Sequence, residues 1–241
     1  MKIILCADTA IGESIAEFLM GEDIVGLGTV PSRDDDLWFK KNSEFCISSF
    51  YQGNVKQFNI LTAELIDELR PDIVLLIQWP HLISKDIVDL VPMLNLHLGL
   101  LPWNRGANPN YWAITEKTPA GVTIHQVDSG IDSGLIISQK EIPVYETDNG
   151  SDVYKRLAIA AVDLFKETWL MIKARDIIPL RTNEGGSIHY RKQFSKKLDL
   201  TSEQEHLLRT IRALTFEGAP LPFYVSDGIR YEIELTIKKL D

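Results

Sequence analysis

The chain has 241 residues, of which 45% are hydrophobic and 24% are charged, and its formal net charge is −9 at pH 7. This balance predicts a globular protein with one large domain, or one domain and a small appendage. The negative charge disfavours a protein that grips nucleic acid along an extended phosphate backbone, but it leaves open a small phosphorylated ligand in a local basic pocket.

The first hundred residues alternate between short apolar runs and amphipathic segments, which is typical of a parallel sheet covered by helices. The run "PDIVLLIQW" is apolar throughout, as in a strand that is buried on both faces. Pro31 to Asn42 is polar and is interpreted as a loop. The expected strands are 2–7, 24–30, 71–79 and 93–99, and the expected helices are 7–19, 62–70 and 82–92.

The second half continues the pattern and then changes in composition. Further strands are expected at 120–128 and 135–142, a long amphipathic helix at 150–175, a short helix at 202–213 and a hairpin around Asp227-Gly228. The segment 181–196 between these parts is polar and contains glycine. We therefore expect an α/β domain over 1–185 with a Rossmann-like, mostly parallel sheet and helices on both faces. Residues 186–241 are expected to form a C-terminal appendage for dimerisation or nucleotide contacts.

Several classes of protein are disfavoured. The chain reaches Asp8 too early for the apolar core of a signal peptide, and no apolar run approaches the roughly 18 residues of a membrane span. Its two cysteines, Cys6 and Cys46, form no CxxC motif and no metal-ligand spacing. We expect a cytoplasmic protein with no metal and no membrane partner.

Asn95 and His97 are polar residues within an apolar strand. Strand alternation puts both on one face, near the carboxyl end where parallel sheets bind ligands. An asparagine amide can donate to an oxyanion, and a histidine can carry a proton at a carbonyl under attack. The alternative, a satisfied pair of polar core residues, has about equal weight on the strand alone.

Asp132 lies between Gly130 and Gly134 in "DSGIDSG", a loop whose glycines allow a close approach to a ligand. Its carboxylate is a candidate to orient His97 or to raise its basicity. Asp128 is a rival for this role, but we interpret it as a turn former at a strand end. His125 is interpreted as structural or exposed.

"NLHLGLLPWNRGANPNYWAI" followed by "AGVTIHQVDSGIDSGLII" resembles the formyltransferases that use 10-formyltetrahydrofolate. The shared pattern is Asn-x-His, Leu-Pro and Arg-Gly, then Gly-Val-Thr and an Asp in a glycine-bounded loop. The resemblance covers residues 71–142 well and the first 70 residues by pattern only. The sequence departs from it at Gly99, where Ser often stands, and this puts one local hydrogen bond in doubt.

The resemblance implies a catalytic triad of Asn95, His97 and Asp132 that needs no metal. Asn95, with His97, would stabilise the oxyanion when an amine attacks the formyl carbon. His97, supported by Asp132, would assist proton transfer from the amine to the folate nitrogen.

The resemblance also implies that the pterin lies against backbone in two segments, 77–84 and the loop Asp128–Asp132. Packing within a loop is the alternative for Trp79 and His81. The expected folate-binding residues are Gln78, Trp79, Pro80, His81, Ile83, Val127, Asp128 and Gly130.

Three kinds of amine substrate compete. The acidic chain and short tail disfavour a methionyl-tRNA formyltransferase, and the first loop, with its single glycine, disfavours a glycinamide ribonucleotide formyltransferase. "LPWNRGANPNYWAI" is similar to the sugar N-formyltransferases, which act on dTDP- or UDP-linked amino-deoxysugars of bacterial surface polysaccharides such as O-antigen. Two other possibilities are a catalytically silent binder of folate or nucleotide sugar, and a formyl-folate hydrolase that shares the triad.

The candidate substrate residues lie after the Asn-x-His strand and in the tail. Arg105, Lys192 and Arg212 are expected to offset pyrophosphate charge, with surface solvation as the alternative. The tail aromatics are candidates for base stacking or dimer packing, with a small hydrophobic cluster as the alternative. The full set is Arg105, Gly106, Asn108, Asn110, Tyr111, Lys192, Arg212, Phe216, Phe223 and Tyr224. The hairpin also favours a homodimer.

Overall fold

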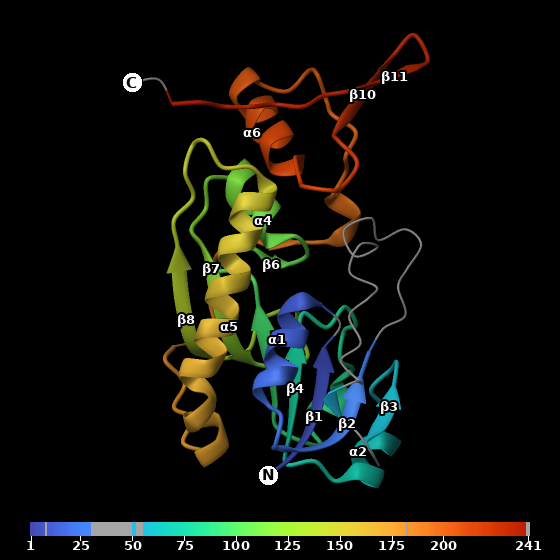
Figure 1. Cartoon of the computed structure of the whole chain (residues 1–241), viewed down its shortest axis with the longest axis vertical. Helices are drawn as coiled ribbons and strands as arrows, with labels where there is room; N and C mark the ends of the chain where they lie inside the picture. The colour runs from blue at the N-terminus through green and yellow to red at the C-terminus, as the bar shows by residue number, and fades with distance from the viewer. Residues whose placement is uncertain (8, 30–49, 52–54, 182, 240–241) are drawn as a thin grey trace.

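The computed structural model describes residues 1–7, 9–29, 50–51, 55–181 and 183–239, so the polar segment Pro31 to Asn42 lies outside it. Its centre is a seven-stranded sheet in the order β3-β2-β1-β4-β5-β7-β8 (Figure 1). The expected α/β class, with a mostly parallel sheet, is confirmed. The strands are β1 (Lys2–Ala7), β2 (Asp23–Gly28), β3 (Lys56–Phe58), β4 (Ile73–Ile77), β5 (Met93–His97), β7 (Ala120–Gln126) and β8 (Ile136–Ile142).

The first five strands pair in parallel, but β7 runs antiparallel to β5, and β8 runs antiparallel to β7. The change of direction at β5 fixes which residues of β5 and β7 lie opposite each other. Asn95 lies opposite His125, and His97 lies opposite Thr123. Asn95 and His97 therefore lie beside β7, the strand that leads into the loop 127–135.

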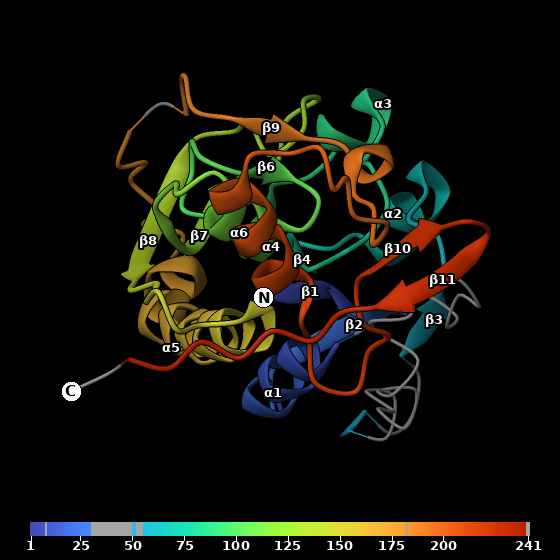
Figure 2. The same ribbon diagram turned by 90° about the horizontal axis from the view of Figure 1, so that it is seen from above.

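Alternation along the strands divides the core between two faces of the sheet. Ile3 and Leu5 belong to the larger cluster, whereas Ile4 and Cys6 belong to the smaller one. The helices α1 (Ala10–Phe18) and α5 (Gly150–Ala174) cover the first face. The helices α2 (Ala63–Leu69) and α3 (Lys85–Val88) cover the opposite face (Figure 2). Helices thus lie on both faces, as expected.

Side-chain caps fix where the main helices begin. The Thr62 hydroxyl accepts from the amide of Leu65 at 3.3 Å, so the expected cap of α2 is present. Asn149 and Asp152 form a reciprocal capping box at the start of α5. Although α5 has 25 residues, no helix of the described chain is long and apolar enough to cross a membrane.

Two segments differ from the sequence expectation. The helix expected over 82–92 is only the single turn Lys85–Val88. Residues 82–84 are not helical, and the chain turns at 89–90 before Pro92. The segment after β5, where no helix or strand was expected, contains helix α4 (Pro109–Thr115) with proline at its start. It also contains the short strand β6 (Arg105–Gly106), which pairs in parallel with β9 (Ile188–His189). This pairing could not be predicted from the sequence, because it joins only two residues of each segment and the segments are far apart in the chain.

The C-terminal elements lie beyond the end of the sheet toward which β1 and β4 point (Figure 1). They are α6 (Gln204–Leu214) and the hairpin of β10 (Phe223–Ser226) and β11 (Ile229–Glu232), preceded by the 3-10 turn η3 (Arg191–Gln193). Asp227 and Gly228 form the turn with positive φ angles of 50° and 77°, as a two-residue hairpin loop requires. The expected helix and hairpin are confirmed, and a domain boundary at 185/186 stays a prediction.

The packing of α5 gives a direct test of the fold. Phe165 is 2% exposed and stacks on Trp169, whereas Ile159 on the same helix is 66% exposed. We expect Phe165→Ala to lower the free energy of unfolding by about 3–5 kcal/mol, because it leaves a cavity under the sheet. Ile159→Ala should change it by no more than about 0.5 kcal/mol. Urea denaturation measures both, and equal losses would contradict this placement of α5.

Candidate active site

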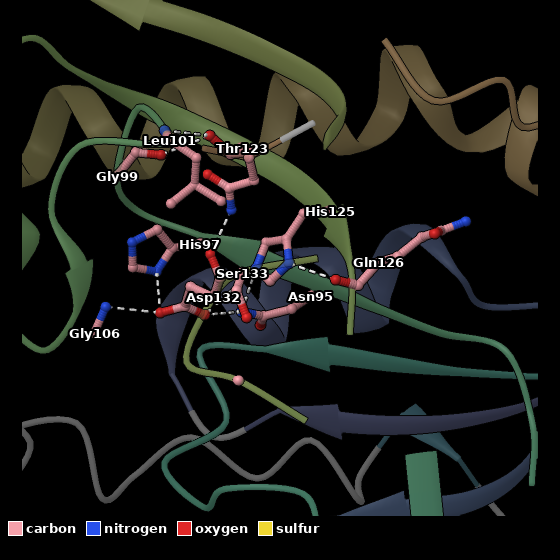
Figure 3. A network of polar contacts seen from close by, with 12 residues as sticks. Asn95, His97, Gly99, Leu101, Gly106, Thr123, His125, Gln126, Asp132 and Ser133 are labelled. Carbon is pink, nitrogen blue, oxygen red and sulfur yellow. Dashed lines mark hydrogen bonds and ion pairs between the residues drawn. The ribbon is translucent and has the colours of Figure 1, made fainter. Parts of the chain in front are cut away.

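Asn95, His97 and Asp132 meet at the carboxyl end of β5 (Figure 3). The Asn95 amide nitrogen donates to Asp132 Oδ1 at 3.0 Å, and His97 Nδ1 lies 3.5 Å from Asp132 Oδ2. Asn95 and His97 therefore do share a face of the strand, as alternation predicts. Asp132 reaches them from the loop between β7 and β8, so the structure brings the three predicted residues together.

Hydrogen bonds restrain both the carboxylate and the backbone of Asp132. The Gly106 amide donates to Oδ2 at 2.8 Å, and the Asn183 side chain donates to the Asp132 carbonyl oxygen at 2.5 Å. The residue has a φ of 45°, a left-handed conformation that side chains other than glycine adopt less readily. These contacts hold a locally unfavourable backbone in place. Asn183 was not predicted from the sequence, since nothing local marks a contact across 51 positions.

Asp128 makes the hydrogen bonds that are expected of a turn former. Its Oδ1 accepts from the Gly130 amide at 2.9 Å and from the Ser133 hydroxyl at 2.6 Å. These bonds close the loop that carries Asp132.

Burial opposes ionisation of Asp132, but its neighbours outweigh that cost. The imidazoles of His97 and His125 and the amide of Gly106 hold the pKa of the Asp132 carboxyl well below its usual range. The carboxylate is therefore a fixed negative charge at neutral pH, positioned between two imidazoles.

His97 is buried behind this carboxylate. Its Nε2 donates to the Asn104 carbonyl oxygen at 2.9 Å, because that oxygen can only accept. A Cβ at Gly99 would lie 2.5 Å from the same Nε2, so the ring in this position requires glycine there. The departure at Gly99 thus has a physical consequence, because a larger residue would displace the imidazole. The Gly99 carbonyl still accepts from Thr123 Oγ1 at 2.7 Å.

His125 requires a correction. It is 2% exposed and belongs to the same polar cluster, with Nε2 3.1 Å from the Asn95 amide nitrogen and 3.4 Å from Asp132 Oδ1. The possibility of a surface position was wrong, because pairing of β7 with β5 places His125 opposite Asn95. The register between two strands separated by a helix cannot be deduced from local alternation.

A pocket of about 310 Å³ opens beside the cluster. Asn95, His125 and Asp132 line it, whereas His97 does not. Most of the predicted folate-binding residues also line it: Trp79, Pro80, His81, Ile83, Val127, Asp128 and Gly130. Gln78 does not, because its side chain instead accepts from the Thr9 hydroxyl at 2.6 Å on the α1 side.

Another wall of the pocket comes from residues that the sequence analysis did not name, although they adjoin the predicted Lys192. His189, Tyr190 and Arg191 line the pocket beside Gly106 and Ala107. The pairing of β6 with β9 places them there. Among the predicted substrate residues, Gly106 lies on this wall, and Lys192 lies next to it with its ammonium 6.0 Å from the Tyr190 ring.

Other predicted substrate residues near β6 do not line the pocket. Arg105 donates to the Gly185 carbonyl oxygen, and Asn108 and Asn110 lie at the start of α4. Tyr111 is only 9% exposed and packs against Phe194.

The predicted tail residues lie away from this pocket. Arg212 is 5% exposed and donates to the carbonyl oxygens of Tyr145 and Glu146. Phe223 packs under the Arg230 guanidinium and Tyr224 stacks on Tyr231 within the hairpin. Phe216 lines a separate cavity of about 410 Å³ at the start of α5. The structure does not bring these four residues to the site. In the described residues, no group of three or more His, Cys, Asp or Glu side chains is arranged to hold a metal ion.

Comparison with known proteins gives this geometry a context. Residues 34–168 match the family described as formyl transferase. The chain is 31% identical over 182 residues to the bifunctional polymyxin resistance protein ArnA of Wigglesworthia glossinidia brevipalpis. The aligned region covers 73% of this chain and 27% of that protein. It is 34% identical to a methionyl-tRNA formyltransferase of Corynebacterium efficiens over 64% of this chain and 50% of that protein. The chain thus spans half or less of the length of these two relatives.

A third relative is similar over a larger share of its own length. The dTDP-4-amino-4,6-dideoxyglucose formyltransferase of Mycobacterium tuberculosis is 31% identical, over 64% of this chain and 67% of that protein.

Solved structures are similar over most of the chain. A sugar N-formyltransferase from a Shewanella species has a TM-score of 0.81 at 22% identity and covers 100% of this chain and 99% of its own, which shows the shared fold. The formyltransferase PseJ from Anoxybacillus kamchatkensis has a TM-score of 0.57 at 31% identity, with 80% and 87% coverage. Its structure is a complex with UDP-4,6-dideoxy-4-formamido-L-AltNAc and tetrahydrofolate.

The buried carboxylate gives a pH-dependent prediction. Because its pKa is lower in the folded state, Asp132 stabilises the fold above the unfolded-state pKa of about 3.9, and this contribution is lost as pH falls below that value. We therefore expect Asp132→Asn to lower the free energy of unfolding most at neutral pH, with the difference from the native chain shrinking toward about pH 3.

Urea unfolding at a series of pH values measures this difference. Asp163→Asn on α5, whose carboxylate side chain is 51% exposed, is the matched control for the loss of one negative charge. A pH-independent difference for Asp132→Asn would contradict the electrostatic account.

Proposed function

The chain belongs to the formyl transferase family, and from this membership we propose that it transfers the formyl group of 10-formyltetrahydrofolate to the amino group of a dTDP- or UDP-linked amino-deoxysugar. The observation that carries the proposal is the cluster of Asn95, His97 and Asp132 against one wall of a pocket. An oxyanion donor and a fixed carboxylate–imidazole pair are the groups that acyl transfer to an amine requires.

Each residue has a role that its position supports. Asn95 lies on the pocket wall, where its amide can donate to the formyl oxygen as negative charge develops during attack by the amine. Asp132 also lines the pocket and is ionised, so it can attract a proton from the attacking amine. His97 lies behind it, with Nδ1 3.5 Å from Asp132 Oδ2, so a proton that reaches Nδ1 stabilises that charge. The proton finally goes to the departing folate nitrogen.

The folate end of the pocket is the wall formed by 79–83 and 127–131. Leu82, Ile83 and Val127 supply apolar surface, and Trp79 packs edge-on against His81. Both segments line the pocket, so their backbone groups can pair with a pterin ring. These residues fit the co-substrate, and the tetrahydrofolate complex of the relative PseJ supports the same choice.

The amino-sugar end is the opposite wall, with Gly106, His189, Tyr190 and Arg191. Within the described chain, Arg191 forms no ion pair with a carboxylate, so its guanidinium is available for a bidentate contact with a pyrophosphate. Lys192 lies beside it. The mycobacterial relative is named for a dTDP-linked 4-amino sugar, and PseJ binds a UDP-linked 4-formamido sugar. Both support a nucleotide-linked acceptor but leave the base open.

Two alternatives are a different amine substrate and a protein that binds folate and nucleotide sugar without catalysis. Methionyl-tRNA is disfavoured by the net charge of −9, which is unfavourable for contact with an extended phosphate backbone. A silent binder of folate and nucleotide sugar is disfavoured because the three catalytic residues are present and in contact.

The test is a panel of acceptors incubated with 10-formyltetrahydrofolate and read by mass spectrometry for the gain of one formyl group. The panel contains thymidine- and uridine-linked 3- and 4-amino sugars, glycinamide ribonucleotide and methionyl-tRNA. We expect a nucleotide-linked amino sugar to react, and Asn95→Ala to slow this reaction by about 10²–10³-fold. Reaction of another acceptor alone would replace the sugar assignment, and binding without turnover would identify a silent binder.

We further propose that the protein is a homodimer that uses the hairpin. Val225, Ile229 and Tyr231 are 46%, 56% and 42% exposed, and a two-stranded hairpin is marginally stable without further packing. We expect a dimer at micromolar concentration in sedimentation velocity, and a monomer for Ile229→Lys. Ile178→Lys changes an isoleucine that is 73% exposed outside the hairpin and should leave the dimer intact. A monomeric native chain would contradict the proposal.

A further inference from the structure

Asp132 is restrained at its side chain and at its backbone by two segments that pair with each other. The Gly106 amide on β6 donates to the carboxylate Oδ2 at 2.8 Å (Figure 3). The Asn183 side chain, which precedes β9 in the chain, donates to the Asp132 carbonyl oxygen at 2.5 Å. Because β6 pairs with β9, both donors belong to one unit, the β6–β9 ribbon, formed by residues 104–107 and 183–189.

The chain on both sides of Asn183 is hydrogen-bonded to other elements. Before it, the Leu180 amide donates to the Ile136 carbonyl oxygen of β8 at 2.7 Å. After it, the Ser187 carbonyl oxygen accepts from the Arg105 amide at 3.0 Å. The Asn183 side chain is itself buried, at 7% exposure. Its amide is therefore a donor in a fixed place.

The bond from Asn183 acts on a backbone that is locally unfavourable. A carbonyl oxygen only accepts, so the side-chain nitrogen of Asn183 is the atom that faces Asp132. Asp132 has a φ of 45°, and such a conformation persists where the surroundings hold it. Without the bond, the peptide group of Asp132 could rotate toward a commoner conformation. The carboxylate would then move as well, because the direction of the Cα–Cβ bond follows the backbone.

We infer that Asn183 is a positioning residue that acts through Asp132. It keeps the carboxylate where Oδ1 accepts from the Asn95 side chain at 3.0 Å and Oδ2 accepts from the Gly106 amide. Asn183 is absent from the described residues that line the pocket, so its effect should fall on kcat and not on substrate binding. The kinetic consequence rests on the proposed function, because it requires Asp132 to act on the attacking amine.

Two substitutions separate hydrogen-bond donation from packing. Asn183→Ala removes the donor and much of the side-chain volume, whereas Asn183→Leu removes the donor but keeps a side chain of similar size. We expect both variants to lower kcat by about 10-fold with KM unchanged, because misplacing a catalytic group by about 1 Å can cost about 10²-fold and the other donors to Asp132 remain. Glu184→Ala changes the exposed neighbour of Asn183 and should keep full kcat.

The other outcomes would overturn the inference. A folded Asn183→Ala variant with full kcat would do so. A loss in Asn183→Ala that Asn183→Leu restores would show that the side chain acts by filling space. Thermal unfolding shows whether the variants fold, and failure of both to fold would show a structural role in place of positioning.

A double-mutant cycle tests the route of the effect. In an Asp132→Asn background, Asn183→Ala should have little further effect on kcat, because the carboxylate through which it acts has been removed. The same fractional loss in the native and the Asp132→Asn backgrounds would contradict this route.

A measurement without substrate separates this inference from the proposed function. The Gly106 amide proton bonds the Asp132 carboxylate, so its chemical shift should change in Asn183→Ala. The amide protons of Arg105 and Ala107 bond carbonyl oxygens within the ribbon and should keep their shifts.

This spectral pattern without formyl transfer to any acceptor would leave the positioning intact and reject the proposed function. An unchanged Gly106 proton would reject the positioning, whatever the activity. Changes in all three protons would show that the substitution loosens the whole ribbon, and they would also reject the positioning.

Discussion

The burial of one ionised carboxylate, that of Asp132, is the constraint around which the site is organised. A buried charge is costly unless donors surround it, and here the donors come from separate parts of the chain. Asn95 belongs to β5 and Gly106 to β6, and the imidazole of His125 on β7 lies 3.4 Å from Asp132 Oδ1. The sheet and its loops therefore have to be in place before the charge is satisfied, and the satisfied charge in turn orders the side chains around it.

The change from parallel to antiparallel pairing at β5 provides much of this arrangement. In a purely parallel sheet, the strand next to β5 would arrive by a crossover helix and end at the same edge. Because β7 runs in the opposite direction, its last residues lie beside the middle of β5, and the loop that follows turns back over the end of that strand. Asn95, His125 and Asp132 meet for this reason, although 30 or more positions separate Asn95 from each partner.

The features that depend on local sequence pattern were predictable. Alternation predicted that Asn95 and His97 share a face, the long apolar runs predicted the buried strands, and the family pattern added Asp132. The same reasoning failed where a contact depends on register or on distant pairing. His125 looked like an ordinary strand residue until β7 was placed opposite β5. Asn183, His189 and Arg191 carried no local signal, because the pairing of β9 with β6 that brings them to the site involves only two residues on each strand. The tail residues were assigned by residue type alone, and Arg212 instead supports a turn from within the core.

The strand pairing between β6 and β9 has a wider consequence for how this architecture can be divided and changed. The segment around 183–191 contributes one pocket wall, and it also restrains the backbone of Asp132 through Asn183. If the proposed function holds, recognition of the acceptor and support of the charged centre are thus encoded in one short stretch of chain. An exchange of C-terminal segments between relatives would alter both properties together, so new acceptor preferences in such proteins are more readily reached by point changes on this stretch than by swapping whole modules.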